Sequence, residues 1–426
     1  MNTAHKNYDV AVIGGGPAGA SAAAFMARSG LEVCVLEQKS FPRQKVCGEF
    51  ISPAGWSVLA DLNVASRLHA MAGPALKYVA VYPEWGLELR GALPVHDDGH
   101  CARAIGRDVL DFILLQRAAE LGATIFQPVH VSQVRGGART GFEVFYGGSP
   151  RPLHARMVVL AHGSPRLGAM NSPSPGQHRN ANRPDAPPSD IAGWLCFKIH
   201  LENVHLSDDT IAIGGVEGLY AGLVRTGSSG SAPNARPVTC MPRYNLAFVV
   251  ERRLLRQYGS AAELYGYLQE HNNGFGRCLR HARPIGDFLA CGPMVPGVRQ
   301  VYTDGRFFVG NAAGEVHALI GEGLTLALGA GQLLGRVIGE HRAALAGGED
   351  LAVIGEAYRD RWLDQFGSRL RWGNVFSQVL MRTLLSALAT AYLHAFPDIF
   401  SMCIRWSGKQ AGISRPKPQT GAANVR

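Results

Sequence analysis

Residues 8–37 read YDVAVIGGGPAGASAAAFMARSGLEVCVLE, and this stretch decides the fold. A short apolar run, a cluster of glycines and an alanine-rich segment that ends at Gly30 predict a strand, a turn and a helix. A second apolar run, LEVCVLE, follows immediately. A strand, a helix and a second strand of this length form the βαβ unit of a Rossmann-like nucleotide-binding domain.

The glycines of the turn have the GxGxxG spacing at Gly14, Gly16 and Gly19. The first permits the tight turn, the second lets the backbone approach a pyrophosphate, and the third lets helix and strand pack closely. Ala18 lies in the first turn of the predicted helix, whose free N–H groups and positive dipole end attract phosphate. Glu37 closes the second strand 18 residues after Gly19, where a carboxylate accepts ribose hydroxyls. The pattern predicts an adenine dinucleotide but does not separate NAD from FAD.

The bulk properties exclude several classes of protein. The chain has 426 residues, 46% hydrophobic and 18% charged, enough for one large domain or two joined domains with a real core. Its eight cysteines are scattered, with no CxxC pair and no metal-ligand spacing, which favours a reducing cytoplasm and no structural metal. The first residues lack the features of a secretion signal, so we expect no secretion.

The net charge of +9 raises the question of a nucleic-acid partner. The arginines are spread along the chain, and no basic motif is interleaved with aromatic residues. We therefore expect no nucleic-acid partner. A basic surface that attracts anionic substrates, cofactors or lipid is the expected consequence.

Four further segments decide between the dinucleotides. They read FPRQKVCGEFISP at 41–53, VVLAHGS at 158–164, GLYAGLVRTG at 218–227 and DGRFFVGNAAGEVHALIGEGLTLAL at 304–328. In this order they resemble the geranylgeranyl reductase branch of the p-hydroxybenzoate-hydroxylase-type flavoproteins, over most of residues 8–345. The resemblance implies one FAD, a mixed sheet above the flavin that holds the substrate, and an external donor that reduces the flavin.

The remaining patterns complete the predicted organisation. Residues 166–190 are dense in Pro, Ser and Asn and predict an exposed or mobile loop, whereas the short apolar segments of 194–250 predict an antiparallel sheet. A buried strand at 306–310 and an apolar helix after it return the chain to the first domain. The expected fold is α/β (α+β), with a Rossmann-like FAD-binding domain, an inserted mixed or antiparallel β-sheet substrate domain and a C-terminal helical region. The predicted parts are 1–75, 105–165 and 301–345 for the FAD-binding domain, 76–104 and 191–300 for the substrate domain, 166–190 for the loop and 346–426 for the C-terminal helices.

Residues 358–406 predict two or three helices, the last of which is rich in Leu and Ala. Arg382 and His394 interrupt the apolar run and Pro397 follows it, which argues against a simple membrane span. Two fates stay open for these helices. They pack on the core, or they rest on the inner face of a membrane to receive a lipid.

The late motif supplies a second part of the flavin site. Gly310 and Asn311 end a predicted strand, where the polar side chain can bond the ribityl chain of the flavin. The resemblance places Asp at the position of Asn311 and proline at that of Ala318, so both are departures. The next helix begins at GEGL, and its dipole would point at the pyrimidine edge of the flavin ring. The cofactor residues predicted in this helix start are Gly321, Glu322, Gly323 and Leu324.

Arg107 opens a predicted amphipathic helix. In the wider flavoprotein group an arginine at this place reaches the FAD, and a phosphate is a suitable bidentate partner for it. The alternative is a solvated arginine at a helix start. The wider group also prefers Asp where this chain has His162, which we interpret as a neutral donor to flavin or substrate. The resemblance adds Val131 and Gly163 to the cofactor site.

Cys47 is the main candidate for chemistry on the substrate. In geranylgeranyl reductases the cysteine of the matching KxCGxxxSP segment lies close to the flavin, so the resemblance places Cys47 and Gly48 at the cofactor. There a thiol can donate a proton after hydride transfer to a double bond. The flanking Lys45 would favour its thiolate. The alternative is a small buried apolar residue, which free cysteine often is.

The chain has one dinucleotide fingerprint and no cysteine arrangement for an iron–sulfur cluster. The reductant is therefore NAD(P)H bound transiently, or an external carrier of the ferredoxin-like or quinone-linked kind. Three functions stay open, because fold does not imply function. The first is a reductase of an isoprenoid, polyketide or lipid-like substrate. The alternatives are an FAD monooxygenase acting on an aromatic or phenolic substrate, and an electron-transfer partner without substrate chemistry. A flavin-dependent halogenase is disfavoured, because a WxWxIP-like segment is lacking.

Overall fold

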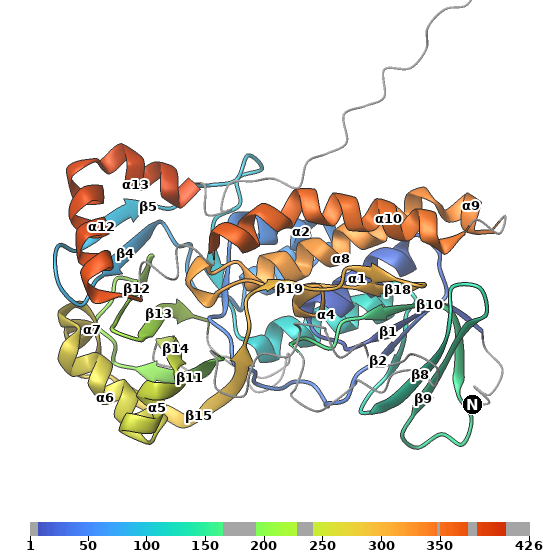
Figure 1. Ribbon diagram of the computed structural model, residues 1–426, viewed down its shortest axis with the longest axis horizontal. Helices are drawn as coiled ribbons and strands as arrows, with labels where there is room; N and C mark the ends of the chain where they lie inside the picture. Colours follow the sequence, from blue (N-terminus) through green and yellow to red (C-terminus); the bar gives the residue numbers. More distant parts are fainter. Residues whose placement is uncertain (1–6, 165–192, 228–241, 347–349, 374–380, 406–426) are drawn as a thin grey trace, which may run out of the picture.

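The computed structural model describes residues 7–164, 193–227, 242–346, 350–373 and 381–405. Two large sheets form the scaffold and lie one after the other along the long axis of the molecule (Figure 1). The predicted loop at 166–190 and the start of the predicted helix at 374–380 lie outside the described residues.

The first sheet contains the glycine motif. Its strand order is β17-β18-β10-β1-β2-β7, and the neighbouring strands from β18 to β7 are parallel. A hairpin, β8 with β9, extends from β10. The strands are β1 (Tyr8–Ile13), β2 (Val33–Leu36), β7 (Thr124–Phe126), β8 (Val131–Gly137), β9 (Gly141–Tyr146), β10 (Leu153–Leu160), β17 (Tyr302–Thr303) and β18 (Arg306–Phe308). The predicted strand, helix and second strand are thus present at the N-terminus, and the chain returns to this sheet at β18.

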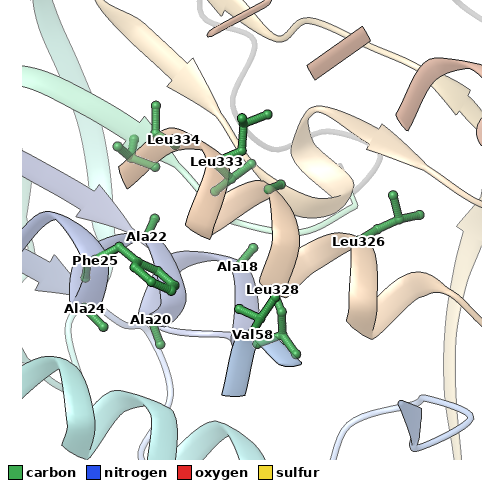
Figure 2. Close-up of a cluster of buried hydrophobic side chains, with 14 of the residues drawn as sticks. Ala18, Ala20, Ala22, Ala24, Phe25, Val58, Leu326, Leu328, Leu333 and Leu334 are labelled. Carbon is green, nitrogen blue, oxygen red and sulfur yellow. The ribbon is translucent and has the colours of Figure 1, made fainter. Parts of the chain in front are cut away.

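Helix α1 (Pro17–Arg28) is the central helix of this layer, and it packs against α8 (Gly323–Glu340) (Figures 1 and 2). All its residues except Arg28 are buried, and most of them are alanine. Cβ atoms built at Gly331 and Gly335 of α8 would lie 2.6 Å from the Ala22 nitrogen and 2.3 Å from the Phe25 Cβ. The two helices therefore approach too closely for larger side chains. This contact joins the two parts of the flavin site.

Further helices cover the same domain, and Figure 1 labels α2, α4, α9 and α10 among them. They are α2 (Pro53–Asp61), α3 (Ala65–His69), α4 (Arg107–Glu120), α9 (Arg342–Ala346) and α10 (Leu351–Trp362). Helix α4 buries Leu110, Ile113 and Leu114, as its amphipathic pattern predicts. Short elements complete the domain: β3 (Phe50–Ile51), β6 (Arg103–Ala104), β16 (Gly297–Val298), β19 (Gly314–Glu315), the 3-10 turns η1 (Gly310–Ala312) and η2 (Ala318–Ile320), and the π-helical turn η3 (Leu363–Gly367).

The second sheet is mixed and has the order β15-β11-β14-β13-β12-β4-β5. β12 and β4 are parallel, and the other pairs are antiparallel. The strands are β4 (Tyr78–Tyr82), β5 (Leu89–Ala92), β11 (Trp194–Glu202), β12 (Thr210–Val216), β13 (Leu219–Thr226), β14 (Arg243–Glu251) and β15 (Arg283–Met294). The predicted fold class is confirmed, because a Rossmann-like domain is joined to a mixed sheet formed largely by a later segment.

One face of this sheet packs on three helices that the sequence analysis did not predict. They are α5 (Arg252–Tyr258), α6 (Ala261–His271) and α7 (Asn273–Leu279). Phe197, Leu246 and Phe248 of the sheet pack there in one cluster with Leu264 and Phe275. Each helix is short and has few apolar positions, so its periodicity is too weak to stand out in the sequence. The other face of the sheet is left for the flavin domain.

Two C-terminal helices, α12 (Thr383–Ala395) and α13 (Pro397–Ile404), lie beside β4 and β5 at the outer end of the second sheet (Figure 1). In the part of the chain that the structure describes, no single helix has the length and apolar character of a membrane span. The pair α12 and α13 reaches that length and composition only together, and it is bent by 112°.

Candidate functional site

The turn between β1 and α1 is shaped so that only glycine fits at two of its positions. Gly14 has a φ of +106°, and a Cβ there would lie 2.5 Å from the Ala161 carbonyl oxygen. A Cβ at Gly19 would lie 1.9 Å from the Gly14 carbonyl oxygen. Gly16 is the N-cap of α1, and no side chain among the described residues accepts a hydrogen bond from the first N–H groups of this helix. Free N–H groups at a helix N-terminus, next to a tight glycine turn, form a site for a pyrophosphate.

Gly310 of the late motif meets this same helix start. A Cβ at Gly310 would lie 2.8 Å from the Cβ of Ala18, and the φ of Gly310 is +59°. The backbone at Gly310 therefore lies against the first turn of α1. Two predicted cofactor segments that lie far apart in the sequence are therefore adjacent in space.

Glu37 is buried at the end of β2, beside the glycine turn. Its Oε2 accepts a hydrogen bond from the Gly15 N–H at 2.7 Å, and its Oε1 accepts one from the Lys39 N–H at 2.8 Å. Its backbone carbonyl accepts from the Val129 N–H at 2.8 Å. The Glu37 carboxylate is thus held next to the glycine turn, at the place predicted for a group that accepts ribose hydroxyls. Val131 lies two residues beyond Val129, and its side chain packs in the core around β8 and β9.

Arg107 is buried, so the alternative of a solvated arginine is wrong. Its Nε and Nη2 donate to the two carboxylate oxygens of Asp111, each at 2.7 Å. Burial opposes the charge, but Asp111 outweighs it and raises the pKa of Arg107. The nearest heavy atom to a Cβ built at Gly16 is the Arg107 Nη2, at 3.9 Å. A fixed positive charge therefore lies beside the glycine turn.

The Cys47 thiol lies within hydrogen-bonding reach of the same Arg107 side chain. The Glu49 N–H donates to the Cys47 Sγ at 3.3 Å, and the Asn245 Nδ2 donates to the Cys47 carbonyl oxygen at 3.0 Å. A Cβ built at the next residue, Gly48, would meet no atom within 4 Å. The thiol is held between a cation and an N–H donor, in a segment that borders open space.

Lys45 lies two residues before Cys47, and its effect on the Cys47 thiolate stays a prediction. The Arg107 guanidinium lies within hydrogen-bonding reach of the Cys47 thiol, and the Lys45 Nζ lies 3.5 Å from the position of a Cβ on Gly163. Burial, with the nearby charge of Arg107, lowers the pKa of Lys45. Lys45 therefore belongs with the VVLAHGS segment.

His162 directly precedes Gly163, two residues after the end of β10, and the residue is exposed. Desolvation of the imidazole lowers the pKa of His162 against the opposing hydrogen bond with the Gly163 backbone, and the charges of Arg299 and Lys45 lower it further. A lowered pKa leaves the imidazole neutral at neutral pH. This is the protonation state that a neutral donor to flavin or substrate requires.

The departure at Asn311 has a structural reason. The Asn311 Nδ2 donates to the Glu315 Oε1 at 2.9 Å and to the Ser164 Oγ at 3.1 Å. The other oxygen of Glu315 pairs with Arg299 at 2.7 Å. An aspartate at 311 would place two carboxylates in contact, so the amide suits this neighbourhood.

The start of α8 is the other predicted contact with the flavin. Gly321 has a φ of +69°, in the left-handed region, and turns the chain from η2 into the helix. A Cβ at Gly323 would meet no atom within 4 Å, whereas Leu324 is buried in the core. The Ser52 Oγ donates to the Glu322 Oε2 at 3.1 Å. The helix start is therefore tied to the Cys47 segment, with space in front of Gly323.

Sequence reasoning missed a buried ion cluster around Glu49, which is fully buried and has a φ of +58°. The Lys198 Nζ donates to its Oε1, and the His200 Nε2 lies 3.1 Å from its Oε2. Burial disfavours the carboxylate, but the hydrogen bond from His200 and the charge of Lys198 outweigh it and lower the pKa of Glu49. The available signal was the two polar residues at alternate positions of WLCFKIHL, Lys198 and His200, which place both side chains on one face of a strand. This pattern does not reveal that their partner is Glu49, about 150 residues earlier in the chain.

The sheet face that carries Lys198 and His200 is open in its middle. A Cβ at Gly222, in the middle of β13, would meet no atom within 4 Å, and its partner across the sheet is Ala247. The Tyr220 hydroxyl donates to the Leu319 carbonyl oxygen at 3.3 Å. Small residues therefore line the centre of this face.

His317 also faces this region, with its ring 5.6 Å from that of Trp194 and 6.4 Å from that of Tyr220. Burial lowers the pKa of His317 to about 4, so the ring is neutral at neutral pH. Its Nδ1 accepts from the Leu319 N–H at 3.3 Å. Its buried Nε2 has no hydrogen-bond partner among the described residues, and such an atom is suited to bond a ligand.

These features fit FAD. The glycine turn, the buried Arg107 and the Glu37 carboxylate suit the pyrophosphate and ribose, and the free space at Gly323 lies where the flavin ring would pass. When bound, FAD supplies a hydride donor and acceptor.

Comparisons with known proteins agree with this fit. Residues 7–164 match the model of the FAD binding domain. The chain is 27% identical over 407 residues to digeranylgeranylglycerophospholipid reductase 2 of Methanopyrus kandleri, with 90% of each chain covered. These findings confirm the resemblance to geranylgeranyl reductases.

Two solved structures share the fold. The flavin-dependent brominase Bmp2 has a TM-score of 0.74 at 17% identity, with 95% of this chain and 94% of that chain covered. A geranylgeranyl bacteriochlorophyll reductase-like protein of Thermoplasma acidophilum has a TM-score of 0.64 at 17% identity, with 93% and 98% covered. At this identity the likeness shows the fold alone. The matched domain and the reductase relative together indicate an FAD-dependent oxidoreductase, and the solved structures show its fold.

Proposed function

We propose that the protein is an FAD-dependent reductase that saturates a double bond of an isoprenoid, polyketide or lipid-like substrate. The observation that carries this proposal is the position of Cys47. Its thiol is within reach of Arg107, and its segment borders open space at Gly48, between the flavin domain and the sheet. The similarity to a digeranylgeranylglycerophospholipid reductase supports a substrate of this class.

In this reading Cys47 donates the proton that completes reduction of the double bond. The Arg107 guanidinium and the Glu49 N–H would stabilise the negative charge that remains on the sulfur. The ion cluster of Glu49, Lys198 and His200 positions the backbone that makes this contact. Neutral His162 would donate a hydrogen bond without adding charge.

The substrate would lie against the small residues of the second sheet. Gly222 and Ala247 offer an apolar floor, and the ion cluster closes one end of it. An extended hydrocarbon would bind well to this surface, because a hydrocarbon is held by apolar contact area rather than by hydrogen bonds.

The test is anaerobic. The protein is reduced, mixed with a panel of prenyl lipids, quinones and alkyl phenols, and the reoxidation of the flavin is followed by its absorbance. A prenyl lipid is expected to reoxidise it, and failure of every unsaturated lipid would contradict the proposal. We expect Cys47→Ser to slow reoxidation by about 10²-fold or more with unchanged flavin content, because a hydroxyl is a far weaker acid. Cys101→Ser, outside the site, is the matched control.

The electron donor is part of the proposal. We propose NAD(P)H, bound transiently, or an external redox protein, since the chain carries one dinucleotide fingerprint. Reduction by NADPH in the absence of any other protein would select the first. If only a ferredoxin-like or quinone-linked carrier reduces the flavin, the electron donor is an external redox protein.

The second candidate is an FAD monooxygenase acting on an aromatic or phenolic substrate, which the same fold accommodates. The aromatic rings of Trp194 and Tyr220 beside the open face favour it. Substrate-stimulated NAD(P)H oxidation with stoichiometric oxygen consumption would identify this activity. If neither test shows turnover and electrons pass only to a protein carrier, the protein is an electron-transfer partner.

We also propose that the protein works in the cytoplasm with α12 and α13 resting on the inner face of a membrane. The polar Ser386 and Thr390 of α12 are buried, whereas Leu384 and Leu388 are 68% and 61% exposed. This is the reverse of the usual arrangement of a surface helix. An apolar face turned outward is what an interfacial helix presents to lipid.

Neighbouring residues support an anionic lipid surface as the partner. Trp85, on the adjoining β4–β5 loop, is 65% exposed, and Tyr392 is exposed on α12. Both are side chains of the membrane interface. Asp398 is the one acidic residue in Thr383–Ile404, and exposed Arg382 and Arg405 flank that segment. The arginines suit anionic head groups, and the apolar face suits the acyl chains.

Sedimentation with phosphatidylglycerol-containing vesicles tests this contact. The protein is expected to sediment with them, and Leu388→Asp is expected to lower the bound fraction several-fold, because a charge is placed in the apolar face. Val353→Asp, at an exposed apolar residue of α10, is the control and should bind as the wild type. Equal binding of the two variants, or no binding of the wild type, would contradict the proposal.

A further inference from the structure

Two cysteines face each other across neighbouring strands of the second sheet. Cys196 of β11 and Cys291 of β15 are directly opposite in the antiparallel register. Residues in such positions share a face, with Cβ atoms about 4.5–5.5 Å apart and Cα atoms about 4.5–5.5 Å apart. A disulfide spans Cα separations of about 4.4–6.8 Å and Cβ separations of about 3.5–4.5 Å, so the Cα spacing of this pair already fits and a bond requires the two Cβ atoms to approach by about 1 Å. The two thiols lie within hydrogen-bonding reach of each other.

The two thiols are not equivalent. Cys291 is an exposed residue, although its sulfur is partly desolvated. The hydrogen bond from Cys196 and the charge of Lys45 lower the pKa of the Cys291 thiol against the opposing effects of this desolvation and of Glu315. The same hydrogen bond, with burial, raises the pKa of Cys196. One sulfur is therefore an accessible nucleophile, and the other is a protonated partner next to it.

The surroundings of the pair suit reversible oxidation. β15 is the edge strand of its sheet, and its pairing with β11 shifts register between Trp194 and Cys196. An edge strand with a break in its ladder tolerates small adjustments better than a central strand does. By contrast, Cys34 and Cys278 are buried in the cores of the two domains.

We propose that Cys196 and Cys291 form a reversible disulfide when the protein meets a hydroperoxide. The Cys291 thiolate attacks one oxygen of hydrogen peroxide, the O–O bond breaks, and the leaving hydroxide takes a proton to become water. The sulfenic acid on Cys291 is then attacked by the Cys196 sulfur, the S–O bond breaks, and a second water leaves. Two thiols are oxidised to one disulfide, and one peroxide is reduced to two waters.

The disulfide would join the edge strand to the strand of the ion cluster. Cys196, Lys198 and His200 occupy alternate positions of β11 and therefore share a face. Lys45, which acts on the charge of Cys291, also lies next to Gly163 of the predicted flavin site. Oxidation would remove the titratable Cys291 thiol beside Lys45 and so change the electrostatic surroundings of Lys45. The modification does not depend on which substrate the protein reduces.

The experiment uses the full chain. The purified protein is treated with hydrogen peroxide, its remaining thiols are blocked with N-ethylmaleimide, and its peptides are identified by mass spectrometry with and without dithiothreitol. The expected result is a Cys196–Cys291 linked peptide that dithiothreitol removes. Recovery of both cysteines as separate alkylated peptides after oxidation would overturn the proposal.

Single variants assign the two roles. Cys196→Ser should leave a sulfenic acid on Cys291 that dimedone traps, because the second sulfur is missing. Cys291→Ser should yield neither a sulfenic acid on Cys196 nor a disulfide. Cys101→Ser is the control and should keep the linked peptide. A linked peptide that contains Cys101, or a sulfenic acid formed on Cys196 in place of Cys291, would contradict the assignment.

Discussion

The glycine turn and the Cys47 segment are built in opposite ways, although both belong to the same predicted site. The turn is local: Gly14, Gly19 and Glu37 lie within one βαβ unit, and steric contacts decide its shape. The Cys47 segment is held by charges and hydrogen bonds from Arg107, Lys198 and other distant parts of the chain. The spacing of residues in the sequence reveals the glycine turn, but it does not reveal the distant partners that hold the Cys47 segment. Substitutions in the two regions should therefore fail in different ways.

Gly19→Val tests the steric region and should have the largest effect. A Cβ at this position would lie 1.9 Å from the Gly14 carbonyl oxygen, so the helix cannot keep its place against β1. We expect a colourless protein whose free energy of unfolding falls by about 4 kcal/mol or more. The ratio of flavin to protein and urea unfolding measure the two effects.

The matched control is Gly266→Ala in α6, where a Cβ meets no atom within 4 Å. This variant should keep its flavin and its stability, since alanine favours a helix. If Gly19→Val also retained flavin, the proposed cradle would be wrong.

Glu49→Gln tests the electrostatic region. Removing one partner of a buried ion pair leaves Lys198 buried without its counter-charge, which costs about 3–5 kcal/mol. Urea unfolding of Glu49→Gln, Lys198→Met and the double variant gives the coupling between the two. Glu356→Gln, in an exposed pair with Arg359, should cost at most about 1 kcal/mol. Additive losses in the double variant would contradict the ion cluster.

The same cluster has a predicted pH dependence. The folded-state pKa of Glu49 is lowered, so its contribution to stability is present above the ordinary pKa of a glutamate. That contribution is lost as the pH falls through the lowered folded-state pKa. In Glu49→Gln this acid-side loss should be smaller, as unfolding curves between neutral and acidic pH would reveal.

Asn311→Asp should have the smallest effect of the three, because the side chain is half-buried and the volume is unchanged. The new carboxylate would contact that of Glu315 and lose the hydrogen bond from the amide. We expect a loss of about 1 kcal/mol in stability at neutral pH. The deficit should shrink in acid, where one of the two carboxylates is protonated, and Glu315→Gln should rescue the variant. A more stable Asn311→Asp would show that the flavin, rather than Glu315, decides this position.

Much of the flavin domain could be predicted from the sequence, because its signals are local. The βαβ unit, the strand at β18 and the apolar helix α8 each have a periodicity of their own. The helices α5 to α7 have weak periodicity and were missed. The part of the site around Glu49 was also missed, since an acid in KVCGEFISP does not reveal that Lys198 and His200 will meet it.

The sequence alone determined that a dinucleotide turn opens this chain and that a late glycine-rich helix returns to it, because glycine spacing and apolar periodicity act over a few residues. Only the tertiary structure decided that Arg107 would be buried beside Cys47, that Asn311 would face Glu315, and that Cys196 would stand opposite Cys291. These neighbours are set by how sheets and helices pack. Charge and redox chemistry depend on distances across that packing, and no local pattern encodes them.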